Sequence, residues 1–151
     1  MNEEDKKLAF EAAEKLRLLD VILYESHSSR PNDLPSEDEF EYGLMNKLAV
    51  EYSIQSTSKE SPVLVVKVKL GVRIVSPSTE EDLQTIFSQI EADYLVLYEV
   101  LGEVEDDCFK AFSEFNGVHN AWPFWRQHVF DIVGRSRLPS IEIPLMIGTD
   151  R

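Results

Sequence analysis

The chain has 151 residues, about the size of one ordinary domain, and 43% of them are hydrophobic, which is enough for one core. Fifteen basic residues against 28 acidic ones give a formal net charge of −13. Nucleic acid is bound by displacing counterions with positive charge, so this balance argues against nucleic acid and anionic membranes as partners. It favours a soluble protein that attracts basic or basic-apolar partners by electrostatic steering.

The N-terminal residues and the single cysteine indicate a cytoplasmic protein without membrane insertion. Residues 1–5 are acidic and lack a basic segment followed by an apolar run, so we do not expect a signal peptide. The longest apolar run is far shorter than a membrane span. Cys108 excludes an intramolecular disulfide and fits a reducing compartment. We expect one domain over residues 1–151.

The chain begins with a predicted helix and a predicted buried strand. Asn2 is a suitable N-cap, and apolar residues at helical spacing predict an amphipathic helix over residues 3–15. Residues 18–24 are apolar on both alternating sets, which favours a well-buried strand. Residues 28–38 contain two prolines and several polar residues, so we expect a loop there.

Period-2 alternation predicts that the next two segments are strands. Residues 42–54 and 64–74 each place apolar side chains on one parity and mostly polar ones on the other, with a polar turn between them. This pattern predicts an antiparallel hairpin with one buried and one wetter face. Residues 76–90 combine helix-start residues with helical spacing and predict a short helix, although a strand extension also fits.

Residues 92–101 predict a strong strand that is apolar on both faces. One face can pack against helices, whereas the other needs a second protein surface, either a subunit or a bound client. Residues from both faces are therefore our candidates for a client groove or a subunit interface: Tyr94, Leu95, Val96, Leu97 and Tyr98.

Two helices are expected near the C-terminus. Three phenylalanines spaced three apart predict a short helix over residues 109–115. Asn120 can cap a second helix, with Pro123 in its first turn, that ends near Gly134 and before Pro139. An extended segment follows at residues 141–145. The complete pattern predicts an α+β fold in which sequential strands form a four-stranded antiparallel sheet with helices packed on one face.

A helical wheel of residues 122–134 separates an inward face from an exposed one. Trp122 and Trp125 lie on the inward apolar stripe, whereas Phe124 lies on the side that a monomer would expose. We therefore add Phe124 to the groove or interface candidates. Together with the two-faced strand, it predicts a homo-oligomer, a client groove, or both.

No constellation of residues predicts catalysis. His27, His119 and His128 lack the spacing of metal ligands, and no phosphate-binding loop or nucleophile elbow is present. Cys108 lies beside acids, which raise a thiol pKa and disfavour a nucleophile. We expect neither enzymatic activity nor a cofactor, and an enzyme with a site assembled from distant residues is the rival reading.

Residues 120–139 resemble the long helix and exit turn of the SecB family, which begins aromatic–proline–aromatic–x–arginine. The residues that carry the resemblance, or lie beside those that do, are Trp122, Pro123, Trp125, Arg126, Arg135 and Pro139. A weaker likeness in strand pattern covers most of residues 16–146, which leaves residues 1–15 as an additional N-terminal helix. The resemblance implies a homotetramer, built as a dimer of dimers, that holds non-native polypeptides without ATP.

The resemblance also raises the question of protein export. In the SecB family an acidic sheet surface docks the SecA motor, and Asp20 is the candidate for one of those acids, with Glu25 a weaker one. The sequence lacks the C-terminal helix and tail that also hold SecA, so engagement of SecA stays open. A dedicated-partner adaptor, or a SecB-like chaperone that guards antitoxins of toxin–antitoxin systems, is the alternative.

Overall fold

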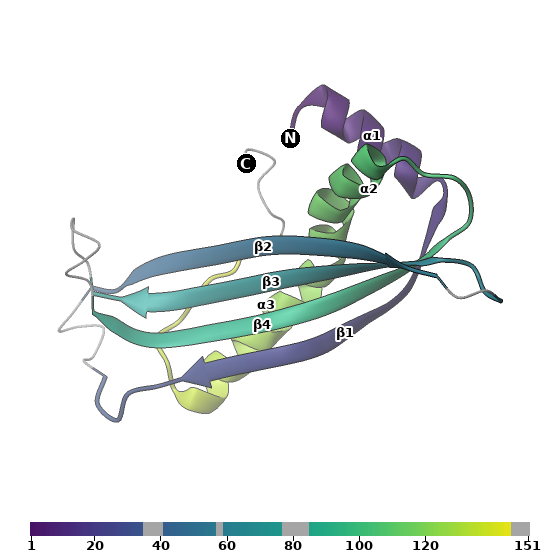
Figure 1. Cartoon of the computed structure of the whole chain (residues 1–151). Helices are drawn as coiled ribbons and strands as arrows, with labels where there is room; N and C mark the ends of the chain where they lie inside the picture. Colours follow the sequence, from purple (N-terminus) through teal and green to yellow (C-terminus); the bar gives the residue numbers. More distant parts are fainter. Residues whose placement is uncertain (35–40, 57–58, 77–84, 146–151) are drawn as a thin grey trace.

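The computed structural model describes residues 1–34, 41–56, 59–76 and 85–145. It is a four-stranded antiparallel sheet with a layer of helices on one face (Figure 1). The predicted α+β architecture is therefore confirmed. In chain order the elements are α1 (Glu3–Ala13), β1 (Leu16–Ser29), β2 (Gly43–Gln55), β3 (Val63–Val75), β4 (Ile86–Val100), α2 (Asp106–Phe112), the π-helical η2 (Ser113–Gly117) and α3 (Val118–Ser136).

The predicted first helix and hairpin are present. The side-chain oxygen of Asn2 accepts a hydrogen bond of 2.7 Å from the backbone N–H of Asp5, as an N-cap should. In the β2–β3 hairpin Leu48 lies opposite Leu70. The apolar parity of β3 is buried throughout, with Leu64, Val66, Val68, Leu70, Val72 and Ile74 at 2% exposure or less.

The strand order is β1-β4-β3-β2, so β1 lies beside the last strand and not beside the next strand in sequence. This order makes β1 an edge strand, and the prediction that it is well buried is wrong. The helix predicted over residues 76–90 is also wrong for residues 86–90, which begin β4, while residues 77–84 lie outside the described part. Pairing with β3 along this stretch, joined by pairing with β1 from residue 89 onwards, outweighs its local helical spacing.

The C-terminal helices join without the predicted break. Helix α2 continues through η2 into α3, so Asn120 and Pro123 lie inside a helix and Asn120 does not cap one. The amide of Asn120 instead donates a hydrogen bond of 2.7 Å to the buried hydroxyl of Tyr98, which anchors α3 to β4. The helix ends at Ser136, followed by Arg137 in the left-handed conformation and then Pro139.

The π-helical segment makes a close contact with the sheet at Gly117. A Cβ on Gly117 would lie 2.7 Å from Cγ1 of Val66 on β3, which is closer than two non-bonded carbon atoms can approach. Glycine is therefore required at this contact. A π-helical turn shifts the helical register by one residue, and here it lies between α2 and α3, both of which bury apolar residues.

The core lies between the helices and the central strands β3 and β4. Trp125 is 2% exposed and Val129 is 1% exposed, so this part of the predicted inward stripe is confirmed. Trp122 is only half-buried, which corrects its placement in the core. The ring of Tyr98 packs edge-on against Phe112 at 4.7 Å between centroids.

Candidate functional site

The edge strand β1 exposes apolar side chains on both of its faces. Leu18 and Leu23 lie opposite Tyr98 and Tyr94 and therefore face the helix side, while Ile22 lies opposite Leu95 and faces the other way. Two bulges shift the register along the strand. Five of its large apolar residues are between 39% and 56% exposed: Leu18, Leu19, Ile22, Leu23 and Tyr24.

The other edge strand, β2, carries a strip of apolar side chains that the helices leave uncovered. This β2 strip consists of Leu44, Leu48 and Ile54, which are 45%, 36% and 41% exposed and face the helix side of the sheet. Between them, Tyr52 is half-buried, and its hydroxyl donates a 3.0 Å hydrogen bond to Asp106 on α2. Burial, aided by Asp106, raises the pKa of Tyr52, so the phenol stays neutral in this position.

The C-terminal segment that was predicted to be extended lies along α3, a position that the sequence did not predict. Trp122 donates an indole hydrogen bond of 2.8 Å to the carbonyl of Pro144, and Arg126 donates one of 3.2 Å to the carbonyl of Ile143. Ile141 and Ile143 are half-buried against the core. Trp122 and Arg126, which match the pattern of the SecB family, therefore have a structural role: they hold the segment that follows α3. Arg135 lies exposed in the last turn of α3.

The outer surface of the helix layer also carries exposed aromatic rings. Phe124 is 51% exposed, which confirms its predicted outward position, and Phe130 is 74% exposed. Phe115 is 44% exposed and stacks on His119 with a centroid distance of 6.4 Å. Phe115 lies in η2, which is in contact with the edge strand β2, whereas Phe124 and Phe130 lie on α3.

The predicted groove candidates do not form one site. Tyr94, Val96 and Tyr98 are 3%, 0% and 2% exposed beneath the helices, so the prediction that they line a groove or interface is wrong for these three residues. Burial raises the pKa of Tyr94 and of Tyr98 to about 12. Leu95 and Leu97 lie half-buried on the opposite, helix-free face of the sheet. The sequence could not separate these faces, because both parities of the strand are apolar.

The helix-free face of the sheet carries charges of both signs. On β3, Lys67 lies opposite Leu95 of β4, Lys69 opposite Asp93, and Arg73 opposite Gln89. Asp20 lies exposed on this face, opposite Leu97, and its carboxylate accepts the backbone N–H of Val21. Ion pairs join Arg17 to Glu99, Lys69 to Glu51 at 2.9 Å, and Lys47 to Glu91 at 3.8 Å. The face differs from the acidic docking surface that the resemblance implies.

The described residues hold no group of three or more histidine, cysteine or acidic side chains suited to a metal ion. The pKa of the Cys108 thiol is raised, first by burial and second by the nearby carboxylate of Glu11. The predicted direction is thus confirmed, although the largest single cause is burial and not a neighbouring acid. None of the helices in the described part of the chain has the length and apolar character of a membrane span.

Neither a family model nor a curated protein sequence matches the chain. Among solved structures it is similar to the SecB-like chaperone Rv1957 of Mycobacterium tuberculosis, determined in complex with a ChAD peptide from the antitoxin HigA1, Rv1956. The TM-score is 0.70 at 16% sequence identity, over 95% of this chain and 99% of that one. The fold is SecB-like. The SecB-like architecture therefore extends over nearly the whole chain, beyond residues 120–139, which carried the specific sequence resemblance.

Proposed function

We propose that this chain is an ATP-independent chaperone, a holdase that binds unfolded or partly folded polypeptides and catalyses no reaction. The observation that carries the proposal is the apolar surface left uncovered at both edges of the sheet. Burying such surface gains roughly 25 cal/mol per Å², so a non-native chain that covers it is retained. The SecB-like fold and the peptide complex of the neighbouring structure support the same function.

The β2 strip is the proposed client site. As an edge strand, β2 offers unpaired backbone N–H and C=O groups to an extended segment. Leu44 and Leu48 lie on one face of that edge, four residues apart, and can contact alternate apolar side chains of an added strand. The formal charge of −13 favours clients whose apolar segments are flanked by basic residues.

The β1 edge is the proposed surface for self-association, in a homotetramer built as a dimer of dimers. A long edge strand with apolar side chains on both faces is a ready template for pairing with another chain. Leu18 and Leu23 would be covered by a second copy on the helix side, and Ile22 on the other side. Phe124 on the helix layer is the proposed contact between dimers.

A second candidate function is the guarding of one antitoxin-like partner. It is favoured by the neighbouring structure, which binds an antitoxin peptide. A general holdase and a dedicated guardian differ in the number of clients they accept. A role in export through SecA would use Asp20, and loss of SecA binding in Asp20→Asn is its test.

Aggregation assays test the main proposal. Several unrelated denatured proteins should stay in solution at near-stoichiometric ratios without ATP. The variant Leu44→Ser/Leu48→Ser should lose much of this protection, while Phe10→Ser, at an exposed apolar position on α1, should keep it. If all clients aggregate as fast with the protein as without it, the holdase proposal fails. Protection of one client alone would favour the dedicated guardian.

Light scattering tests the assembly. The protein should have about four times the mass of one chain at micromolar concentration. Leu18→Ser/Leu23→Ser should give a smaller species while it leaves the secondary structure unchanged. A monomer at high concentration would contradict the proposed assembly.

A further inference from the structure

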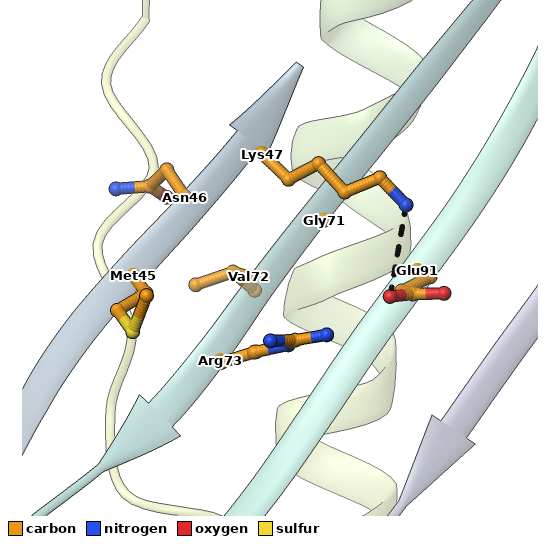
Figure 2. A pocket seen from close by; sticks show the side chains of 7 residues that line it. All are labelled: Met45, Asn46, Lys47, Gly71, Val72, Arg73 and Glu91. Carbon is orange, nitrogen blue, oxygen red and sulfur yellow. Dashed lines mark ion pairs between the residues drawn. The ribbon is translucent and has the colours of Figure 1, made fainter. Parts of the chain in front are cut away.

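A small hollow lies on the helix-free face of the sheet, above Gly71 in the middle of β3. Gly71 has no side chain and pairs with Lys47 on β2 and Glu91 on β4. The resulting space is about 130 Å³ and is lined by Met45, Asn46, Lys47, Gly71, Val72, Arg73 and Glu91. Figure 2 shows the side chains of Lys47 and Arg73 on either side of Gly71, both extending towards β4.

The cations around this hollow are incompletely neutralised. Lys47 lies 3.8 Å from Glu91, a long contact for an ion pair, and Arg73 makes no hydrogen bond or ion pair with any residue that the structure describes. Other bases of this face already have partners. Lys69 pairs with Glu51, and the amine of Lys67 lies 4.4 Å from the ring centroid of Tyr24. Two cations and one carboxylate therefore leave the hollow with one positive charge.

We propose that the hollow above Gly71 binds the carboxylate of an aspartate or glutamate side chain on a partner polypeptide. The planar guanidinium of Arg73 can donate two parallel hydrogen bonds to a carboxylate, and Lys47 supplies a second positive charge. A single negative charge matches the net charge of the site. Glu91, which lines the same space, repels a doubly charged phosphate about twice as strongly as a singly charged carboxylate. Met45 provides an apolar wall for the carbon chain of the bound side chain.

This site is independent of the apolar surfaces at the sheet edges, so its test can fail without affecting the proposed chaperone function. The charge of this site is opposite to that of the acidic docking surface that the resemblance implies, because the site binds acidic groups. The chain as a whole is strongly acidic, and the probe therefore needs a single negative charge to avoid general repulsion.

The test is an NMR titration of the isotope-labelled full chain with a short capped peptide that contains one glutamate. The amide signals of residues 71 and 73 should shift with this peptide and stay unchanged with its glutamine counterpart. Arg73→Gln should weaken binding about tenfold, the effect expected for loss of a charge-assisted pair. Lys69→Gln, on the same face but already paired with Glu51, should leave the affinity within about twofold.

The variant Gly71→Ala tests whether binding depends on the shape of the hollow and not only on its charges. A Cβ at this position would lie 3.4 Å from Cβ of Lys47 and 3.5 Å from Cγ of Glu91, so the strand accepts it while the hollow is filled. Binding should fall although every charge is retained. Equal shifts with the glutamate and glutamine peptides, wild-type affinity in Arg73→Gln or Gly71→Ala, or tighter binding of inorganic phosphate than of the peptide would overturn the proposal.

Discussion

Replacing Gly117 with alanine adds one methyl group where the helix layer contacts the sheet. The new Cβ would lie 2.7 Å from Cγ1 and 3.4 Å from Cβ of Val66, a side chain that is itself fully buried. Alanine favours a helix over glycine by about 1 kcal/mol, whereas overpacking a core typically costs about 1–3 kcal/mol. Val66 lies in a paired central strand and cannot move away, so we expect an overpacking cost in the upper half of that range, about 2–3 kcal/mol, and hence a net loss of about 1–2 kcal/mol.

Urea unfolding followed by tryptophan fluorescence measures this cost, and Val66→Ala supplies the control. Val66→Ala alone should destabilise by roughly 2 kcal/mol, because it leaves a cavity. The double variant should be more stable than the sum of the single losses predicts, by at least about 1 kcal/mol, since the added methyl group then occupies the vacated space. Strict additivity, or a Gly117→Ala variant as stable as the parent chain, would refute the close contact described here.

Two further predictions concern the aromatic core and its pH dependence. Trp125→Ala should lower the free energy of unfolding by about 3–5 kcal/mol, whereas half-buried Trp122→Ala should cost only about 1–2 kcal/mol; urea unfolding of both variants decides between these values. Burial raises the pKa of Tyr98 from 10.0 to about 12, so the stability that this group contributes is present below pH 10 and is lost as the pH rises towards 12. The free energy of unfolding of Tyr98→Phe should therefore fall by about 2–3 kcal/mol less than that of the parent chain between pH 10 and pH 12. Equal falls in the two proteins would refute the raised pKa of Tyr98.

Alternation in the sequence predicts the faces of the strands well, but it does not predict which strand lies at an edge. Leu48 and Leu70 have the same parity and lie opposite each other, yet Leu70 is 2% exposed and Leu48 is 36% exposed. The difference arises because the helices cover β3 and β4 and leave the outer part of β2 open. The β2 strip therefore could not be recognised from the apolar pattern alone.

The order of the strands depends on long-range pairing. The segments that form β1 and β4 are both apolar on two faces, and sequence reasoning expected both to be well covered. The crossover that inserts β3 and β4 between β2 and β1 makes one of them central and the other an edge. Likewise, the hollow at Gly71 requires three strands in register, so no local motif signals it.

Sequence patterns predict helix ends correctly where the end depends only on residues close by in the sequence. Asn2 caps α1 as predicted, and the end of α3 lies between Gly134 and Pro139. They fail at Asn120, a good capping residue whose amide is instead bound to the hydroxyl of Tyr98 on another element. A tertiary hydrogen bond to a buried hydroxyl thus replaces the cap, and the helix continues through the π-helical turn.

Hydrogen exchange measured with and without a permanently unfolded polypeptide tests the central claim most directly. If the chain is a holdase that binds clients at the edge of β2, the bound polypeptide should slow exchange of the amides within residues 43–55, without nucleotide, and Leu44→Ser/Leu48→Ser should abolish the effect. Unchanged exchange throughout the described residues at saturating polypeptide would contradict the proposed chaperone function.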